Sequence, residues 1–110
     1  MPFDSTLAGR IREIVHDEPA ISEQRMFGGM AFLVGGHMAV GASGQGGIIV
    51  RVDPAETASL LAEPQVARME MGGRAMDGWL RVSSDAVAAE EALRSWVERG
   101  LAYAGSLPPK

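Results

Sequence analysis

Paired glycines between apolar runs are the most conspicuous candidates for a ligand site in this sequence. The pairs are Gly28-Gly29 and Gly35-Gly36, and a further glycine-rich stretch spans 41–47. A dinucleotide-binding loop has the pattern G-x-G-x-x-G between a strand and a helix, where amides at the helix start meet the phosphate. In this chain the pairs separate one β-prone run from the next. We therefore interpret them as turns and bulges, because glycine adopts positive φ at little steric cost.

Side chains that commonly carry out catalysis are scarce. The chain has no cysteine and its only lysine is Lys110, which argues against disulfides, thiolate nucleophiles, a phosphate-loop lysine and a Schiff base. The histidines, His16 and His37, lack ligand-like spacing. The seven methionines lack clustered M-x-x-M spacing, which favours core filling over copper binding. We expect no catalytic constellation, no metal and no cofactor.

His37 directly follows the Gly35-Gly36 turn and could act as a general base at its mouth. No aspartate lies nearby in the sequence to orient its imidazole, so a solvent-exposed turn residue is the favoured interpretation. Arg25 and Arg74 each lie close to a glycine pair and a methionine. These two arginines could contribute to a small anion site.

Arginines within β-prone runs are the stronger candidates for binding. Arg51, Arg68 and Arg81 interrupt such runs, and Trp79 alternates with Arg81. If one sheet face carries Arg51, Trp79 and Arg81, it would suit a protein partner, a stacked base or an anionic ligand. The alternative is an ordinary solvated sheet face, on which Glu70 pairs with the arginines.

Composition indicates a folded domain that spans no membrane. Of the 110 residues, 46% are hydrophobic and 22% are charged, and no apolar run approaches the roughly 20 residues of a membrane span. No basic region leads into an apolar core at the start, so we expect no secretory signal and a cytoplasmic location. The net charge of −4 argues against a surface devoted to nucleic acid. A protein partner or self-association is the expected mode of interaction.

Apolar periodicity and capping residues predict the element order α-β-β-β-α-β-β-α. An α+β, two-layer domain with an antiparallel sheet follows, in which all of 1–110 forms one domain and 105–110 forms a C-terminal tail. Residues 20–24 are expected to be a connector. The predicted helices span 3–16, 54–63 and the region from 83 onward, and the predicted strands span 30–34, 38–40, 48–52, 67–71 and 78–82.

Three motifs occur in a fixed order along the chain. They are R-M-F-G-G at 25–29, which contains Phe27, Gly28 and Gly29, then R-A-M-D-G at 74–78 and W-V-E-R-G at 96–100. Together they resemble the N-terminal domain of TfoX/Sxy proteins, in its small single-domain form. The resemblance implies an α+β fold like that of secretion chaperones and MmcQ/YjbR domains. It also implies a link to competence regulation, which is the role of larger relatives with a second, helical domain, but it supplies no catalytic residues.

Two functional hypotheses follow. The first is a non-enzymatic regulatory or interaction module that works through its sheet face or as a homodimer. The second is a small-ligand-binding protein or an unrecognised enzyme, using Arg25, His37 or Arg74 around the glycine pairs. DNA binding is a third and weaker hypothesis, because the chain is acidic.

Overall fold

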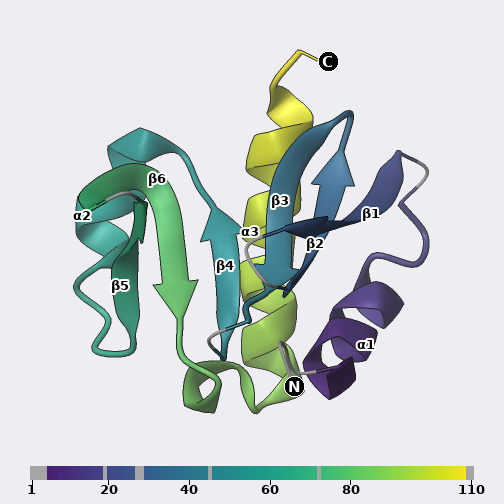
Figure 1. Cartoon of the computed structure of the whole chain (residues 1–110), viewed down its shortest axis with the longest axis horizontal. Coiled ribbons are helices and arrows are strands. Elements are labelled where there is room, and N and C mark those ends of the chain that lie inside the picture. The colour runs from purple at the N-terminus through teal and green to yellow at the C-terminus, as the bar shows by residue number, and fades with distance from the viewer. Residues whose placement is uncertain (1–4, 19, 27–28, 45, 72, 109–110) are drawn as a thin grey trace.

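Alternating apolar residues build a six-stranded antiparallel sheet in the computed structural model, which describes residues 5–18, 20–26, 29–44, 46–71 and 73–108. The strand order is β1-β2-β3-β4-β6-β5 (Figure 1). The strands are β1 (Ile21–Met26), β2 (Gly29–Val34), β3 (His37–Ala42), β4 (Ile48–Arg51), β5 (Val66–Met71) and β6 (Arg74–Val82). The helices are α1 (Ser5–Ile14), α2 (Thr57–Leu60) and α3 (Glu90–Ser106), with 3-10 turns η1 (Pro54–Glu56) and η2 (Asp85–Val87). The α+β class with an antiparallel sheet is confirmed.

The main core lies between the sheet and the helices. The register places Phe32 opposite Val40, Val40 opposite Val50 and Val50 opposite Leu80, so one apolar row crosses four strands. All four side chains are fully inaccessible to solvent. The helical residues of the same cluster are Leu7, Ala8, Ile11, Leu60, Leu93, Trp96, Val97 and Ala104. Burial of this cluster stabilises the fold by about 25 cal/mol for each Å² of apolar surface.

The opposite face of the sheet carries a second, smaller apolar cluster that contains strand residues alone. Trp79 packs at its margin and is only partly buried. No helical residue belongs to this cluster in the described part of the chain. The two faces of one sheet are therefore packed differently. The buried members of the cluster are Ala31, Leu33, Met38, Ile49 and Met69.

Two motif glycines make the close contacts that hold the layers together. At Gly100, α3 lies so close to β3 that a Cβ atom would collide with the carbonyl oxygen of Ala39. Gly78 has φ +86° and occupies an irregular stretch of β6. Its N–H donates to the buried Thr57 hydroxyl (2.8 Å), and its carbonyl accepts from Val52 N–H (2.8 Å). Glycine is needed at this φ because L side chains rarely adopt it.

The structure corrects the predicted elements in several places. Residues 20–24, expected to be a connector, lie largely within β1, an edge strand whose exposed polar side chains hide it from an apolar pattern. The helix expected over 54–63 is a 3-10 turn followed by one short α-helix. The final helix begins at Glu90, because Ala89 has extended backbone and separates it from η2. The same helix runs to Ser106, into the expected tail.

The Gly35-Gly36 turn is confirmed, since both residues have positive φ (58° and 86°) and β2 pairs with β3 on either side of it. None of the helices in the described ranges is long and apolar enough to cross a membrane.

Candidate functional site

Arg51 and Trp79 are cross-strand partners on the face opposite the main core. The guanidinium carbon of Arg51 lies 5.0 Å from the centroid of the Trp79 ring and 5.7 Å from that of Tyr103 on α3. Both distances fall within the range of cation–π attraction. Arg51 therefore links the sheet to α3 as well as contributing to the sheet face. It is half-buried, as is Trp79.

The position of Arg51 follows from the end of a strand ladder. β3 pairs with β4 only from Val40 to Ala42, opposite Ile48 to Val50, so Arg51 lies one residue beyond that ladder. Figure 1 shows β3 and β4 diverging at this end, with α3 behind them. The arginine side chain is thus not confined to one face by a neighbouring β3 residue, and it reaches the Tyr103 ring.

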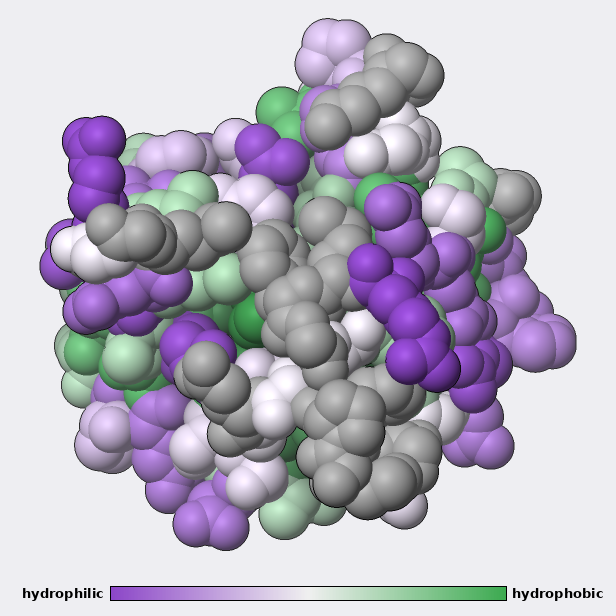
Figure 2. Space-filling view, viewed as in Figure 1, coloured by the Kyte–Doolittle hydropathy of each residue, from purple (hydrophilic) through white to green (hydrophobic). Residues whose placement is uncertain are grey.

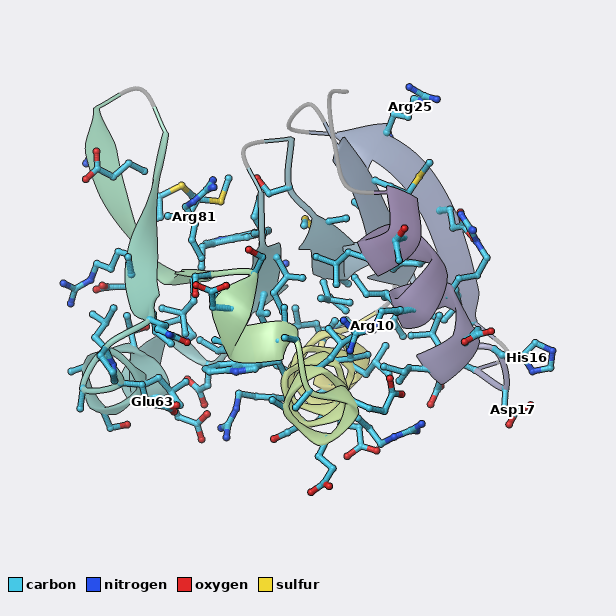
Figure 3. All side chains as sticks on the ribbon, turned by 90° about the horizontal axis from the view of Figure 1, so that it is seen from below. Arg10, His16, Asp17, Arg25, Glu63 and Arg81 are labelled. Atoms are coloured by element: carbon cyan, nitrogen blue, oxygen red, sulfur yellow. The ribbon has the colours of Figure 1, made fainter. Side chains whose placement is uncertain are left out.

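Arg81 lies on the same sheet face as Trp79, two residues further along β6. It is paired in register with Ile49 on β4 and Ala67 on β5. Figure 3 shows Arg81 on the side of the sheet away from α3. Arg81 makes no hydrogen bond or ion pair with another described residue, whereas Arg68 is paired with Asp77 at 2.9 Å.

The structure thus brings together three of the predicted site residues: Arg51, Trp79 and Arg81. With Ile49 and Met69 beside them, these five residues are called the Trp79 face below. In Figure 2, which views this side of the molecule, hydrophobic residues are interspersed with hydrophilic ones. The expected pairing of Glu70 with the arginines does not occur among the described residues. Arg68 is opposite Leu80 in register and so lies on the other face.

The other predicted set, Arg25, His37 and Arg74, is not assembled into one site. Arg25 shares a cross-strand row with Ala42, and His37 lies five residues from that row, about 16 Å along β3. Arg74 is on β6, four strand spacings from β1, which is about 19 Å along the sheet. Figure 3 shows Arg25 near one edge of the sheet. A ligand common to all three has no support in this arrangement.

His37 is half-buried, so the expectation of a solvent-exposed turn residue is wrong. Its Nε2–H donates to the carbonyl oxygen of Pro108 at 2.6 Å, and its Nδ1 is buried with no described partner. Pro108 follows α3 by two residues, so this hydrogen bond joins the segment after α3 to the start of β3. This contact joins residues 71 positions apart. Sequence spacing alone carries no signal for it.

Of the signature residues, Phe27 and Gly28 lie outside the described part of the chain. Gly29 is buried at the start of β2, where a Cβ atom would collide with the carbonyl oxygen of Ala42. Gly29 therefore allows β2 and β3 to approach, and Gly35-Gly36 forms their turn. The described glycines of both pairs thus have structural roles.

An acidic cleft beside α3 was missed by the sequence reasoning. It has a volume of about 490 Å³, and its lining includes Asp53, Glu56, Glu98, Arg99 and Tyr103. Arg99 lies 3.6 Å from Glu56 and 5.5 Å from the Trp96 ring centroid. The cleft forms where η1 meets the outer side of α3. Its acidic residues come from η1 and from α3, which are distant in the sequence, so sequence neighbours gave no signal for it.

The shortest ion pair among the described residues lies away from the Trp79 face and joins α1 to β1. Arg12 donates two hydrogen bonds of 2.8 Å to the two carboxylate oxygens of Glu23. These hydrogen bonds hold the pKa of Glu23 below its usual value. Partial burial of the carboxylate acts in the opposite direction but has a smaller effect. The pair stabilises the edge strand that the sequence pattern did not reveal.

Comparison with known proteins gives a family but no individual relative. The family model of the TfoX N-terminal domain matches residues 13–104. Neither the curated proteins nor the solved structures contain a match. Within the described residues, no group of three or more His, Cys, Asp or Glu side chains is placed to hold a metal ion.

Proposed function

Because the chain belongs to the TfoX N-terminal domain family, we propose that it is a non-enzymatic regulatory module of the cytoplasm that binds a protein partner through the Trp79 face. The observation that supports this proposal is the unequal packing of the sheet. Its core face is covered by helices, whereas Trp79 on the other face stays partly exposed between two arginines. Tryptophan and arginine are among the residues enriched at protein interfaces and at their hot spots.

The charge of this face indicates the chemistry of the partner. Arg51 and Arg81 are its charged members, in a chain with 14 acidic and 10 basic residues. An apolar segment with acidic side chains would place its carboxylates by the arginines and its apolar groups against Trp79. Charge complementarity of this kind raises association rates and disfavours other partners. The competing occupant is a second copy of the chain.

Affinity capture followed by reconstitution tests the proposal. The immobilised protein is used to capture partners, and binding is then measured with each purified partner. We expect Trp79→Ala and Arg51→Glu to lose the specific partner, while Arg94→Glu, a change at an exposed position of α3, retains it. A partner set that Trp79→Ala leaves unchanged, with the circular dichroism spectrum preserved, would contradict the proposal.

Sedimentation measurements separate the two occupants. For the purified protein we expect a monomer at micromolar concentration. A dimer that Trp79→Ala dissociates would replace the partner protein by a second copy, and the proposed heterologous interaction would be wrong.

A further inference from the structure

A second cleft lies at the end of the sheet, where the β3–β4 turn meets the segment after β6. Its volume is about 340 Å³, and Arg81 lines it together with Ser83, Ser84, Gln65 and the Gly46-Gly47 turn. None of the described lining residues is acidic. The acidic cleft beside α3, by contrast, has three carboxylates in its lining. The two clefts therefore favour ligands of opposite charge.

The fold holds the walls of this cleft close together. Gly47 has φ +70°, and a Cβ atom there would collide with the carbonyl oxygen of Val82. The turn is thus pressed against the end of β6. On the other side, Ser83 N–H donates to the carbonyl oxygen of Gln65 at 3.1 Å, which joins the segment after β6 to the start of β5. The cleft is consequently bounded by backbone that is fixed on two sides.

The polar side chains that line the cleft are hydrogen-bond donors with unused capacity. Arg81 is not ion-paired with any residue in the described ranges. Ser84 precedes η2, yet its hydroxyl makes no capping hydrogen bond. The Ser83 hydroxyl accepts a long hydrogen bond from Ala86 N–H (3.4 Å), so its own proton remains free to donate. The Gln65 amide adds a further donor.

We propose that this cleft binds the phosphate group of a small molecule. A guanidinium group forms charge-assisted, bidentate hydrogen bonds with phosphate oxygens, and hydroxyl and amide donors from the other walls can bind the remaining oxygens. A carboxylate offers about four acceptor sites in a single plane, whereas the oxygens of a tetrahedral phosphate can meet donors that converge from several walls. The inference goes beyond the proposed function, because it concerns a small ligand and not the protein partner.

Titration by NMR tests the inference. The ¹⁵N-labelled protein is titrated with inorganic phosphate at constant ionic strength, which is kept by sodium chloride. We expect saturable shifts at the amides of Gly46, Gly47, Ser83 and Ser84, and we expect Arg81→Gln to weaken binding at least about tenfold, since a charge-assisted hydrogen bond is lost. Arg74→Gln is the matched control, because Arg74 is an exposed arginine on the same strand and does not line the cleft.

A substitution of one neutral donor tests the contribution of a second wall of the cleft. Ser84→Ala removes one neutral hydroxyl, so we expect about a threefold to tenfold loss of phosphate affinity. Shifts that grow linearly without saturation, or that persist unchanged in Arg81→Gln with a native-like spectrum, would overturn the proposal.

Two further ligands identify the source of the anion. A phosphomonoester of a small sugar is expected to bind at least as tightly as inorganic phosphate, and acetate is expected to bind more weakly. Acetate binding of equal or greater affinity would contradict a phosphate site. Trp79 does not line this cleft. A failure to bind phosphate would therefore contradict this inference alone, and partner capture with Trp79→Ala would still test the proposed function.

Discussion

The two faces of the sheet are built from the same strands but differ in what covers them. Val50 and Leu80 point to the helices and are fully inaccessible, whereas their neighbours Trp79 and Arg81 lie on the other face and remain half-buried. On the first face, shape complementarity with the helices decides which residues are tolerated. On the second face, polar and aromatic groups retain exposed surface, which is the condition for recognition.

The two faces should differ in how strongly a truncated side chain destabilises the protein. Phe32 is fully buried beneath the helices, so Phe32→Ala should lower the free energy of unfolding by about 3–5 kcal/mol. The adjacent Leu33 lies in the smaller cluster on the other face, so Leu33→Ala should cost about 2 kcal/mol. Urea denaturation measures both. Equal losses would indicate that the two faces are equally well packed.

Gly78 is the next most sensitive position. A Cβ atom there would lie 3.1 Å from the Val52 carbonyl oxygen, and φ +86° is strained for alanine, so Gly78→Ala should cost about 1–3 kcal/mol. Gly9 in α1 has nothing within 4 Å of such an atom, so Gly9→Ala should stabilise the protein by up to about 1 kcal/mol. The midpoints of thermal unfolding should therefore move in opposite directions, and parallel shifts would show that the Gly78 backbone can relax.

Arg51 tests whether the cation–π contacts join the sheet to α3. Arg51→Met keeps the length of the side chain but removes the charge from the Trp79 and Tyr103 rings, so we expect a loss of about 1 kcal/mol. The same change at the exposed Arg94 should stay within about 0.5 kcal/mol of the parent protein. If Arg51→Met matches that control in urea denaturation, the ring contacts contribute nothing measurable.

The smallest expected effect is the pH dependence of the Arg12–Glu23 pair. The folded-state pKa of Glu23 lies below its ordinary value of 4.5, so its contribution is present above that value and is lost as the pH falls through the folded-state pKa. Solvent reaches both side chains, which limits the contribution to less than about 1 kcal/mol. Glu23→Gln should therefore be less stable than the parent at pH 7, and the difference should shrink as the pH falls below 4.5. A constant difference across this range would show that the ion pair is not its cause.

Local patterns predicted the parts of the fold in which neighbouring residues decide the structure. The strand at Ile48 to Arg51 and the Gly35-Gly36 turn both depend on sequence neighbours, and the structure confirms both of them. The resemblance to the TfoX N-terminal domain is confirmed as well.

Contacts between distant segments could not be predicted in this way. β1 is recognisable as a strand only through its pairing with β2, because its exposed side chains carry no apolar alternation. Arg51 reaches Tyr103 only because the β3–β4 ladder ends one residue earlier. The shared face of Arg51, Trp79 and Arg81 did follow from the period of two along each strand.

Chemical-shift mapping of the partner on the ¹⁵N-labelled protein tests the central claim most directly. The Trp79 indole N–H and the amides of Ile49, Arg51 and Arg81 should shift or broaden, while those on the exposed side of α3 should stay in place. Perturbations confined to α1 and α3, with the Trp79 indole signal unchanged, would show that the protein binds through its helical layer and would contradict the claim.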